Sequence, residues 1–403
     1  MFNDERCFMN RRNFIRIMGV GASTMMLSSA VTGCSNNQRM SQPGWTNRDL
    51  DESDIRLKIL SYAMLCPNPH NKQPWLIKFT GPTSFKLFVD PERLLPETDP
   101  YFRQIHIGQG AFLEILEIAA SSFGYGVEIK YFPDGSYSNI EFSEKAIASI
   151  NLVKSLEITI DPLFSEILKR HSNKREYDNV PLTDTEINQL VSFQTENSHY
   201  QIHFEQSSTS KIALEQFLTE AMNIETGNRS RDLETIKMFR FNDDEIKKYR
   251  DGFGLSQSGV TGIRKYFAEK FFLSRPDAEK DPTSFGEQTV DMVKNQTSST
   301  ACFSWLTTNS NERIDQVLIG RDYCRLNLKT SSMGLVQHPM SQILQEYQDM
   351  IPLQSKFKTR FNIKQGETVQ MLFRLGRAEP TLHSPRRVVK EIVGKSINLP
   401  TRL

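Results

Sequence analysis

The order of helical and strand-like segments constrains the fold of this chain more than any other feature of its sequence. Residues 57–65 and 111–123 carry apolar side chains at helical spacing, whereas residues 75–79 and 85–89 are short apolar strands joined by a Gly-Pro turn. Further strands are predicted at 127–132, 301–307 and 368–375, and further helices at 163–169 and 314–332. Because helices and strands mixed in this order pack as layers, we predict an α+β fold.

Residues 208–275 are predicted to be a separate helical segment. They are helical in pattern and charged, and Asp251-Gly252-Phe253-Gly254 interrupts them. A connection this long usually carries a function of its own, so we predict a lid or an inserted helical layer. Before it, Thr183-Asp184-Thr185-Glu186 has the residue pattern of a helix capping box.

The first 50 residues are predicted to be an export signal followed by a flexible linker. Arg11 and Arg12, followed by Phe14-Ile15 and another base, resemble the twin-arginine export signal. Val31-Thr32-Gly33-Cys34 resembles a lipobox, whose cysteine becomes the lipidated first residue. The uncharged stretch between them is too short for a membrane span, which needs roughly 20 apolar residues. We therefore predict a signal peptide at 1–34, a flexible linker at 35–50 and a lipid anchor on the periplasmic side. The alternative is a buried helix start that happens to carry two arginines.

Charge and cysteine content argue against several classes of protein. With 49 basic and 48 acidic residues, the chain has no global attraction for nucleic acid. No cysteine pair or cysteine–histidine group has zinc-ligand spacing, so we predict no metal site. Cys66, Cys302 and Cys324 fit buried thiols best, with a Cys302–Cys324 bridge as the alternative. Dinucleotide-binding, P-loop and G-x-S-x-G motifs are missing from the sequence.

Residues 66–75 are a rigid polar loop between a predicted helix and a predicted strand. Pro67 and Pro69 restrict the backbone, while Asn68, His70 and Asn71 offer hydrogen-bond donors and acceptors. Such a loop suits a planar heterocycle with alternating donors and acceptors. From these residues alone, a proline-rich helix stop beside a buried tryptophan explains the loop equally well.

Two basic clusters lie far from that loop in the sequence. Arg170-His171-Ser172-Asn173-Lys174-Arg175 and Pro385-Arg386-Arg387 could hold a phosphate by charge-assisted hydrogen bonds. A solvated basic helix end is the simpler explanation for each cluster by itself. The clusters become informative only if they converge on one anion.

Taken together, these segments resemble the Acg-type branch of the FMN-binding nitroreductase superfamily. Residues 67–75 are similar to its H-N-x-Q-P-W loop, and residues 170–174 to its flavin-phosphate motif R-H-T-N-R. Residues 334–340 resemble the segment that passes the flavin ring, and residues 370–376 with 385–387 resemble the last strand and terminal arginines. Asp99, Arg103 and Asp251-Gly252 also fit the branch, and the similarity covers roughly residues 51–395.

The resemblance implies an FMN-dependent oxidoreductase with a nitroreductase-like fold, in which two related halves are fused in one chain as a pseudo-dimer. The halves would be residues 51–155 and 156–403, the second carrying the helical insertion near 208–275. Each supplies different motifs, so one composite flavin site per chain follows. A monomer would then take electrons from a small-molecule donor and pass them to a nitroaromatic or quinone-like acceptor. FMN itself would carry the chemistry, without a catalytic side chain.

The resemblance also assigns roles to individual residues. The basic residues would hold the phosphate or ribityl chain, the 67–71 loop would approach the ring edge, and Pro339-Met340 would pack on the ring. A backbone N–H of Met340 or Ser341 would donate to flavin N5. The predicted cofactor-binding residues are Pro67, Asn68, His70, Asn71, Arg170, His171, Ser172, Lys174, Pro339, Met340, Arg386 and Arg387.

Three departures from the family pattern bear on activity. Lys174 stands where the family has arginine, which keeps the charge but loses the bidentate fork. Asn68 replaces the usual serine, and Pro69 removes a backbone donor. An FMN-sequestering protein with little or no turnover is therefore the alternative function, and a cofactor-free scaffold is a further one.

Overall fold

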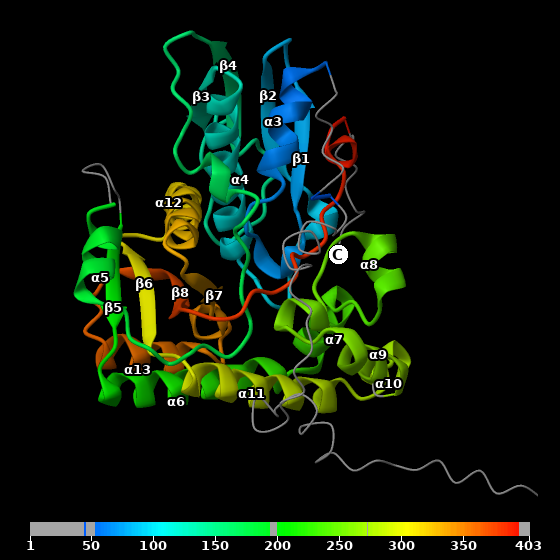
Figure 1. Ribbon diagram of the computed structural model, residues 1–403, viewed down its shortest axis with the longest axis vertical. Coiled ribbons are helices and arrows are strands. Elements are labelled where there is room, and N and C mark those ends of the chain that lie inside the picture. Colours follow the sequence, from blue (N-terminus) through cyan, green and yellow to red (C-terminus); the bar gives the residue numbers. More distant parts are fainter. Residues whose placement is uncertain (1–43, 46–52, 194–199, 272, 395–403) are drawn as a thin grey trace, which may run out of the picture.

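The computed structural model describes residues 44–45, 53–193, 200–271 and 273–394, which form an α+β fold on two antiparallel sheets (Figure 1). The predicted α+β class is confirmed. The predicted export signal with Arg11 and Arg12, the predicted lipidation site Cys34 and most of the linker at 35–50 lie outside the described residues. No helix within the described ranges has both the length and the apolar character needed to cross a membrane.

The first sheet comes entirely from the early part of the chain. β1 (Trp75–Phe79), β2 (Ser84–Val89), β3 (Tyr125–Tyr131) and β4 (Ala148–Lys154) lie in the order β1-β2-β4-β3, with each pair antiparallel. Phe85, Leu87 and Val89 of β2 are buried because alternate residues of a strand point to the same face. The predictions for β1, β2 and β3 are confirmed, whereas β4 is a strand that the sequence reasoning missed.

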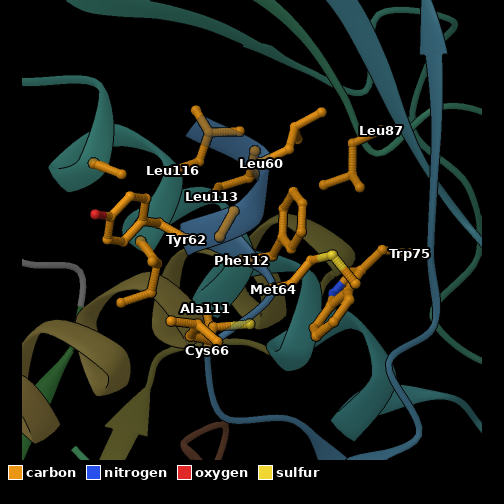
Figure 2. Close-up of a cluster of buried hydrophobic side chains, with 14 of the residues drawn as sticks. Leu60, Tyr62, Met64, Cys66, Trp75, Leu87, Ala111, Phe112, Leu113 and Leu116 are labelled. Carbon is orange, nitrogen blue, oxygen red and sulfur yellow. The ribbon is translucent and has the colours of Figure 1, made fainter. Parts of the chain in front are cut away.

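Two helices complete the core of this sheet. α3 (Ile55–Ala63) and α4 (Arg103–Ser122) contribute to the same buried cluster as the strands. Figure 2 shows Leu60, Phe112 and Trp75 in this cluster, and the rings of Phe112 and Trp75 have centroids 5.0 Å apart. Burial of this apolar surface fixes where the loop between α3 and β1 can lie.

The second sheet comes from the later part of the chain. β5 (Gln201–Glu205), β6 (Cys302–Thr308), β7 (Val336–Pro339) and β8 (Thr368–Gly376) lie in the order β5-β6-β8-β7, again antiparallel. The strands predicted at 301–307 and 368–375 are confirmed. The sequence does not predict β5 and β7, because both are short and rich in polar residues.

A layer of helices lies against the second sheet. α6 (Ser208–Thr226) and α11 (Pro282–Ser298) run side by side beneath it, and their apolar residues join the core of β6 and β8 (Figure 1). Four shorter helices connect them: α7 (Arg229–Met238), α8 (Asp243–Tyr249), α9 (Gly262–Phe271) and α10 (Arg275–Lys280). The helical segment predicted at 208–275 therefore extends to Ser298.

Three other helical predictions have different outcomes. The capping box at Thr183 and Glu186 is present at the start of α5 (Asp184–Val191). The helix predicted at 163–169 is only a short 3-10 turn, Phe164–Glu166. The sequence does not predict α13 (Ile351–Arg360), which packs against the second core.

The two sheets are joined by the crossing of α4 with α12 (Arg313–Ser332), which confirms the helix predicted at 314–332. Gly110 and Gly320 lie at the crossing, where a β-carbon on either residue would overlap a backbone carbonyl of the other helix. Glu114 of α4 pairs with Arg321 at 2.8 Å and with Arg325 at 2.6 Å on α12. Gly110 and Gly320 thus allow the close packing of the two helices.

The C-terminal segment after β8 returns to the first sheet. The Ile77 N–H of β1 donates to Ile392 O at 2.7 Å, and the Gly394 N–H donates to Ile77 O at 3.1 Å. Figure 1 shows this segment crossing from β8 to the edge of β1. Residues 377–394 therefore pass over the junction between the two sheets.

Cysteine chemistry follows from burial. Cys66, Cys302 and Cys324 are free thiols in the apolar interior. The alternative of a Cys302–Cys324 disulfide is therefore wrong.

Candidate functional site

One cavity of about 300 Å³ lies where the first sheet, the second sheet and the helical layer meet. Eleven of the twelve predicted cofactor-binding residues line it: Pro67, Asn68, His70, Asn71, Arg170, His171, Ser172, Lys174, Pro339, Met340 and Arg386. Arg387 does not line it. The loop of the early chain and the basic segment of the late chain therefore share one space, although about 100 residues separate them.

The loop at one wall of the cavity has an unusual backbone. His70, Asn71 and Gln73 have φ values of +48°, +53° and +53°, in the left-handed region that non-glycine residues rarely adopt. The Asn68 side chain closes the loop by accepting a hydrogen bond from the Gln73 N–H at 2.8 Å. Left-handed residues persist only where neighbouring groups hold them.

Asn71 is the main attachment of the loop. Its Nδ2 donates to Gly252 O at 2.9 Å and to Pro385 O at 2.8 Å, and its Oδ1 accepts from Arg386 at 2.7 Å. The Gly252 N–H also donates to Asn71 O at 3.3 Å. The loop is therefore bound to both the helical segment and the C-terminal segment.

The two terminal arginines hold this loop. The Arg386 guanidinium donates to Met64 O at 2.8 Å and to Cys66 O at 3.2 Å, besides Asn71. Arg387 donates its N–H to Gln73 Oε1 at 2.9 Å and its guanidinium to Gln73 O at 3.1 Å. Arg386 therefore reaches the cavity with most of its donors already used by carbonyls, and Arg387 acts on the far side of the loop.

Arg170 and Lys174 keep more of their bonding capacity. Arg170 donates to Asn327 Oδ1 and Leu65 O, each at 3.1 Å, while its buried Nε has no partner among the described residues. Lys174 Nζ lies 4.1 Å from the centroid of the Phe253 ring and forms no ion pair within the described part of the chain. Both cations are held only by neutral groups.

Burial makes these positive charges costly. It lowers the pKa of Lys174 to about 8, and burial together with the charge of Arg170 lowers the pKa of Arg386 to about 9. Glu225 is the single carboxylate that lines the cavity among the described residues, and burial raises its pKa to about 7. The cavity thus has an excess of positive charge that a bound anion would neutralise.

His70 is a neutral donor and acceptor in the cavity. Burial, followed by the charges of Lys174 and Lys72, lowers the pKa of His70 to about 4. Its buried Nδ1 has no hydrogen-bond partner in the described ranges, and its ring lies 5.6 Å from the Phe253 ring. An uncharged imidazole with an open ring nitrogen suits hydrogen bonding to a polar heterocycle.

Pro339 is the last residue of β7, Met340 follows it, and both line the cavity. The Met340 N–H donates to Leu372 O of β8 at 2.8 Å, so it is already used within the sheet. The expectation that Met340 donates to a ligand through its backbone is therefore wrong. The Ser341 N–H, one residue beyond the strand, has no acceptor among the described residues.

The helical segment supplies an apolar wall that the sequence reasoning missed. Phe239, Phe253 and Phe285 line the cavity, and the rings of Phe239 and Phe285 have centroids 5.4 Å apart. Aromatic residues at helical spacing usually belong to a core, so nothing in the sequence marked them. The cavity thus combines cationic side chains with an aromatic wall, and the two meet where Lys174 lies over Phe253. This combination suits an anionic ligand with an apolar ring.

Comparison with known proteins gives local matches. No protein-family model matches the chain. Over 92 residues it is 32% identical to the Mycobacterium tuberculosis proteins "Putative NAD(P)H nitroreductase Rv3131" and "Putative NAD(P)H nitroreductase MT3217". These matches cover 23% of this chain, and the chain spans about a quarter (26%) of the length of the relatives.

Solved structures of three flavoenzymes superpose on part of the chain. The FMN-dependent nitroreductase NfnB from Mycobacterium smegmatis matches 57% of this chain and 96% of its own, with a TM-score of 0.36 and 13% identity. A nitroreductase with bound FMN from Bacteroides fragilis matches 57% and 95%, with a TM-score of 0.32 and 10% identity. The NADPH:FMN oxidoreductase from Vibrio harveyi matches 60% and 80%, with a TM-score of 0.32 and 13% identity. TM-scores of this size do not establish a common fold.

Proposed function

We propose that this protein is an FMN-dependent oxidoreductase of the nitroreductase type. The observation that carries the proposal is the cavity lined by Arg170, Lys174 and Arg386 together with the 67–71 loop. Within the described part of the chain, none of these three cations forms an ion pair with a carboxylate. A buried charge without a counter-charge is costly, so this end of the cavity is suited to a phosphate. The local identity to proteins named as NAD(P)H nitroreductases supports the same class of activity.

The residues present fit FMN at both ends. Arg170 Nε, Lys174 Nζ and Ser172 would bind the phosphate, with the charge of Arg386 behind them. His70 and the Ser341 N–H would meet polar atoms of the ring, and Pro339 and the Met340 side chain would pack on its face. When bound, FMN supplies the two-electron chemistry, while the protein positions it and excludes water.

The organisation of the chain supports one site per monomer. We propose that residues 51–155 and 156–403 are related halves of an internal pseudo-dimer, each built on its own four-stranded sheet. The helical segment near 208–275 would act as a lid over the ring. The donor would be a small reduced molecule and the acceptor an electron-poor nitroaromatic or quinone. From the sequence we also propose twin-arginine export through Arg11 and Arg12 and a lipid anchor at Cys34.

The absorption spectrum of the purified, folded protein tests this function directly. We expect a flavin band, with FMN released on denaturation. Arg170→Ala should weaken FMN binding by ~10- to 100-fold, since a charge-assisted hydrogen bond contributes roughly 1.5–3 kcal/mol. Lys169→Ala is the matched control, because Lys169 belongs to the same segment but pairs with Glu166 at 2.8 Å outside the cavity. A colourless protein that binds no added FMN would support a cofactor-free scaffold instead.

The second candidate function is FMN sequestration with little turnover. It is favoured by the aromatic wall and by the bonds between Gly252 and Asn71, which bring the helical segment against the ring-binding loop. Mixing the yellow protein with NADPH and a nitroaromatic separates the two functions. Bleaching of the flavin followed by recovery of its colour indicates turnover, whereas flavin that neither reagent reaches indicates sequestration.

A further inference from the structure

His338 lines the cavity without a role in the proposed site. It lies on β7 directly opposite Arg374 of β8 in the strand register. The Arg374 guanidinium makes two contacts with the same ring nitrogen, from Nε at 3.3 Å and from Nη2 at 3.1 Å to His338 Nδ1. One nitrogen of the His338 ring is therefore saturated from within the sheet.

Arg374 is held firmly in this position. Its guanidinium is fully buried and also donates to Gln296 O at 2.9 Å and to Arg175 O at 3.1 Å. The Tyr177 ring lies over it, with the centroid 4.1 Å from Cζ. Because a guanidinium only donates, the His338 nitrogen that faces it must accept.

This contact determines the protonation of His338. With Nδ1 accepting, the ring is neutral and its single proton is on Nε2. A proton on Nδ1 would set two donors against each other in a buried place, which disfavours that tautomer by ~10-fold or more. The charged groups that face the ring are Arg374 from β8 and Lys174 from the basic segment, both positive. Nothing anionic among the described groups near the ring would stabilise an imidazolium.

The other ring nitrogen is directed away from Arg374. In an imidazole, Nε2 lies across the ring from Nδ1, and His338 Nε2 has no partner within the described part of the chain. Because the ring lines the cavity while Nδ1 faces the sheet, the Nε2 edge is the one presented to a ligand. We propose that His338 is a permanently neutral hydrogen-bond donor, locked by Arg374, which binds an acceptor atom of the cavity's ligand.

This inference rests on the proposed function and makes it more specific. The ligand atom next to His338 must be an acceptor, such as a carbonyl oxygen or an unprotonated ring nitrogen of FMN. A neutral N–H that donates to an acceptor atom of the flavin ring stabilises negative charge on that atom. Because His338 cannot take up a proton, it does so without adding a full positive charge. His338 thereby sets which edge of the ring faces the second sheet.

The test combines nitrogen NMR with FMN titration of the full chain. Histidine ¹⁵N spectra should show His338 protonated on Nε2 alone, without titration between about pH 5 and pH 8. His338→Phe should weaken FMN binding ~10-fold and shift the flavin absorption band, and His338→Gln, which retains a donor, should stay within ~3-fold of the wild type. His203→Phe is the matched control, since His203 stacks on Trp305 in the same sheet and does not line the cavity.

The outcomes separate failure of the His338 proposal from failure of the proposed function. A wild-type protein that binds FMN while His338→Phe binds it equally well, with an unshifted spectrum, overturns this inference alone. Titration of His338 in that pH range does the same. A wild-type protein that binds no FMN overturns the proposed function and this inference with it. If His338→Phe does not fold, weaker binding by His338→Asn than by His338→Gln supports the donor, and equal binding by both at the wild-type level refutes it.

Discussion

The substitution Gly320→Ala tests how the crossing of α4 and α12 holds the two sheets together. A β-carbon at Gly320 would lie 2.8 Å from the carbonyl carbon and 3.0 Å from Cα of Ile107, and would overlap the Ile107 oxygen. Ordinary carbon contacts are about 3.5–4.0 Å, so the helices would have to separate by about 1 Å or more. Both clashing groups belong to backbones and cannot rotate away.

The sign of the effect separates this packing from simple helix propensity. Overpacking typically costs about 1–3 kcal/mol, and the rigid contact at Gly320 places the cost at the upper end. Replacing a helical glycine with alanine stabilises the helix itself by about 1 kcal/mol. We therefore expect Gly320→Ala to lower the free energy of unfolding by about 1–2 kcal/mol, a factor of about 5–30 in the folded-to-unfolded ratio.

Urea unfolding followed by far-UV circular dichroism measures this change. Gly108→Ala is the control on α4, because its β-carbon would come no nearer than 3.3 Å to Pro69 Cδ, a contact that a shift of a few tenths of an ångström relieves. It should unfold near the wild-type midpoint. A Gly320→Ala variant more stable than the wild type would refute the close crossing of the helices, since propensity alone would then decide the result.

Three further predictions concern the loop, the cation and the thiols. Asn71→Ala should destabilise the protein by about 2–4 kcal/mol in urea unfolding, because it leaves buried carbonyls and a guanidinium donor unpaired, and an unchanged midpoint would contradict the loop attachment. FMN affinity should fall above about pH 8, where the buried Lys174 loses its proton, and should stay flat in Lys174→Arg; a flat wild-type titration would contradict this. Burial raises the pKa of Cys66 and Cys302 to about 12 and that of Cys324 well above its usual value. These three thiols should therefore resist alkylation at about pH 8 until the chain unfolds, and mass spectrometry of the alkylated protein measures this.

Local sequence determines many of the elements that build the site. All five predicted strands are present because apolar residues bounded by turns have few alternatives to a sheet. Thr183 and Glu186 form the expected capping box since both partners lie within one helical turn. The prolines of the 66–75 loop likewise end α3 where the sequence indicates.

The composition of the cavity wall was decided by the tertiary structure. Phe285 lies on α11, Phe239 directly follows α7, and Phe253 lies between α8 and α9. They line one cavity because α7 packs against α6 and α11, and no periodicity in the sequence distinguishes them from core residues. The Met340 N–H is engaged because β7 pairs with β8, which the sequence did not predict. Because β7 was not predicted, the Met340 N–H was wrongly assigned to the ligand.

By itself, the sequence determined where the basic residues and the polar loop lie along the chain and which elements flank them. Only the tertiary structure decided what these residues bind: Arg386 meets Met64 O across 322 positions, and the partner of His338 is Arg374 on the neighbouring strand. Periodicity and turn chemistry act within a few residues, whereas a guanidinium or an imidazole takes its partner from whatever the folded core brings within about 3 Å. The chemistry of the cavity is for this reason a property of the packed molecule.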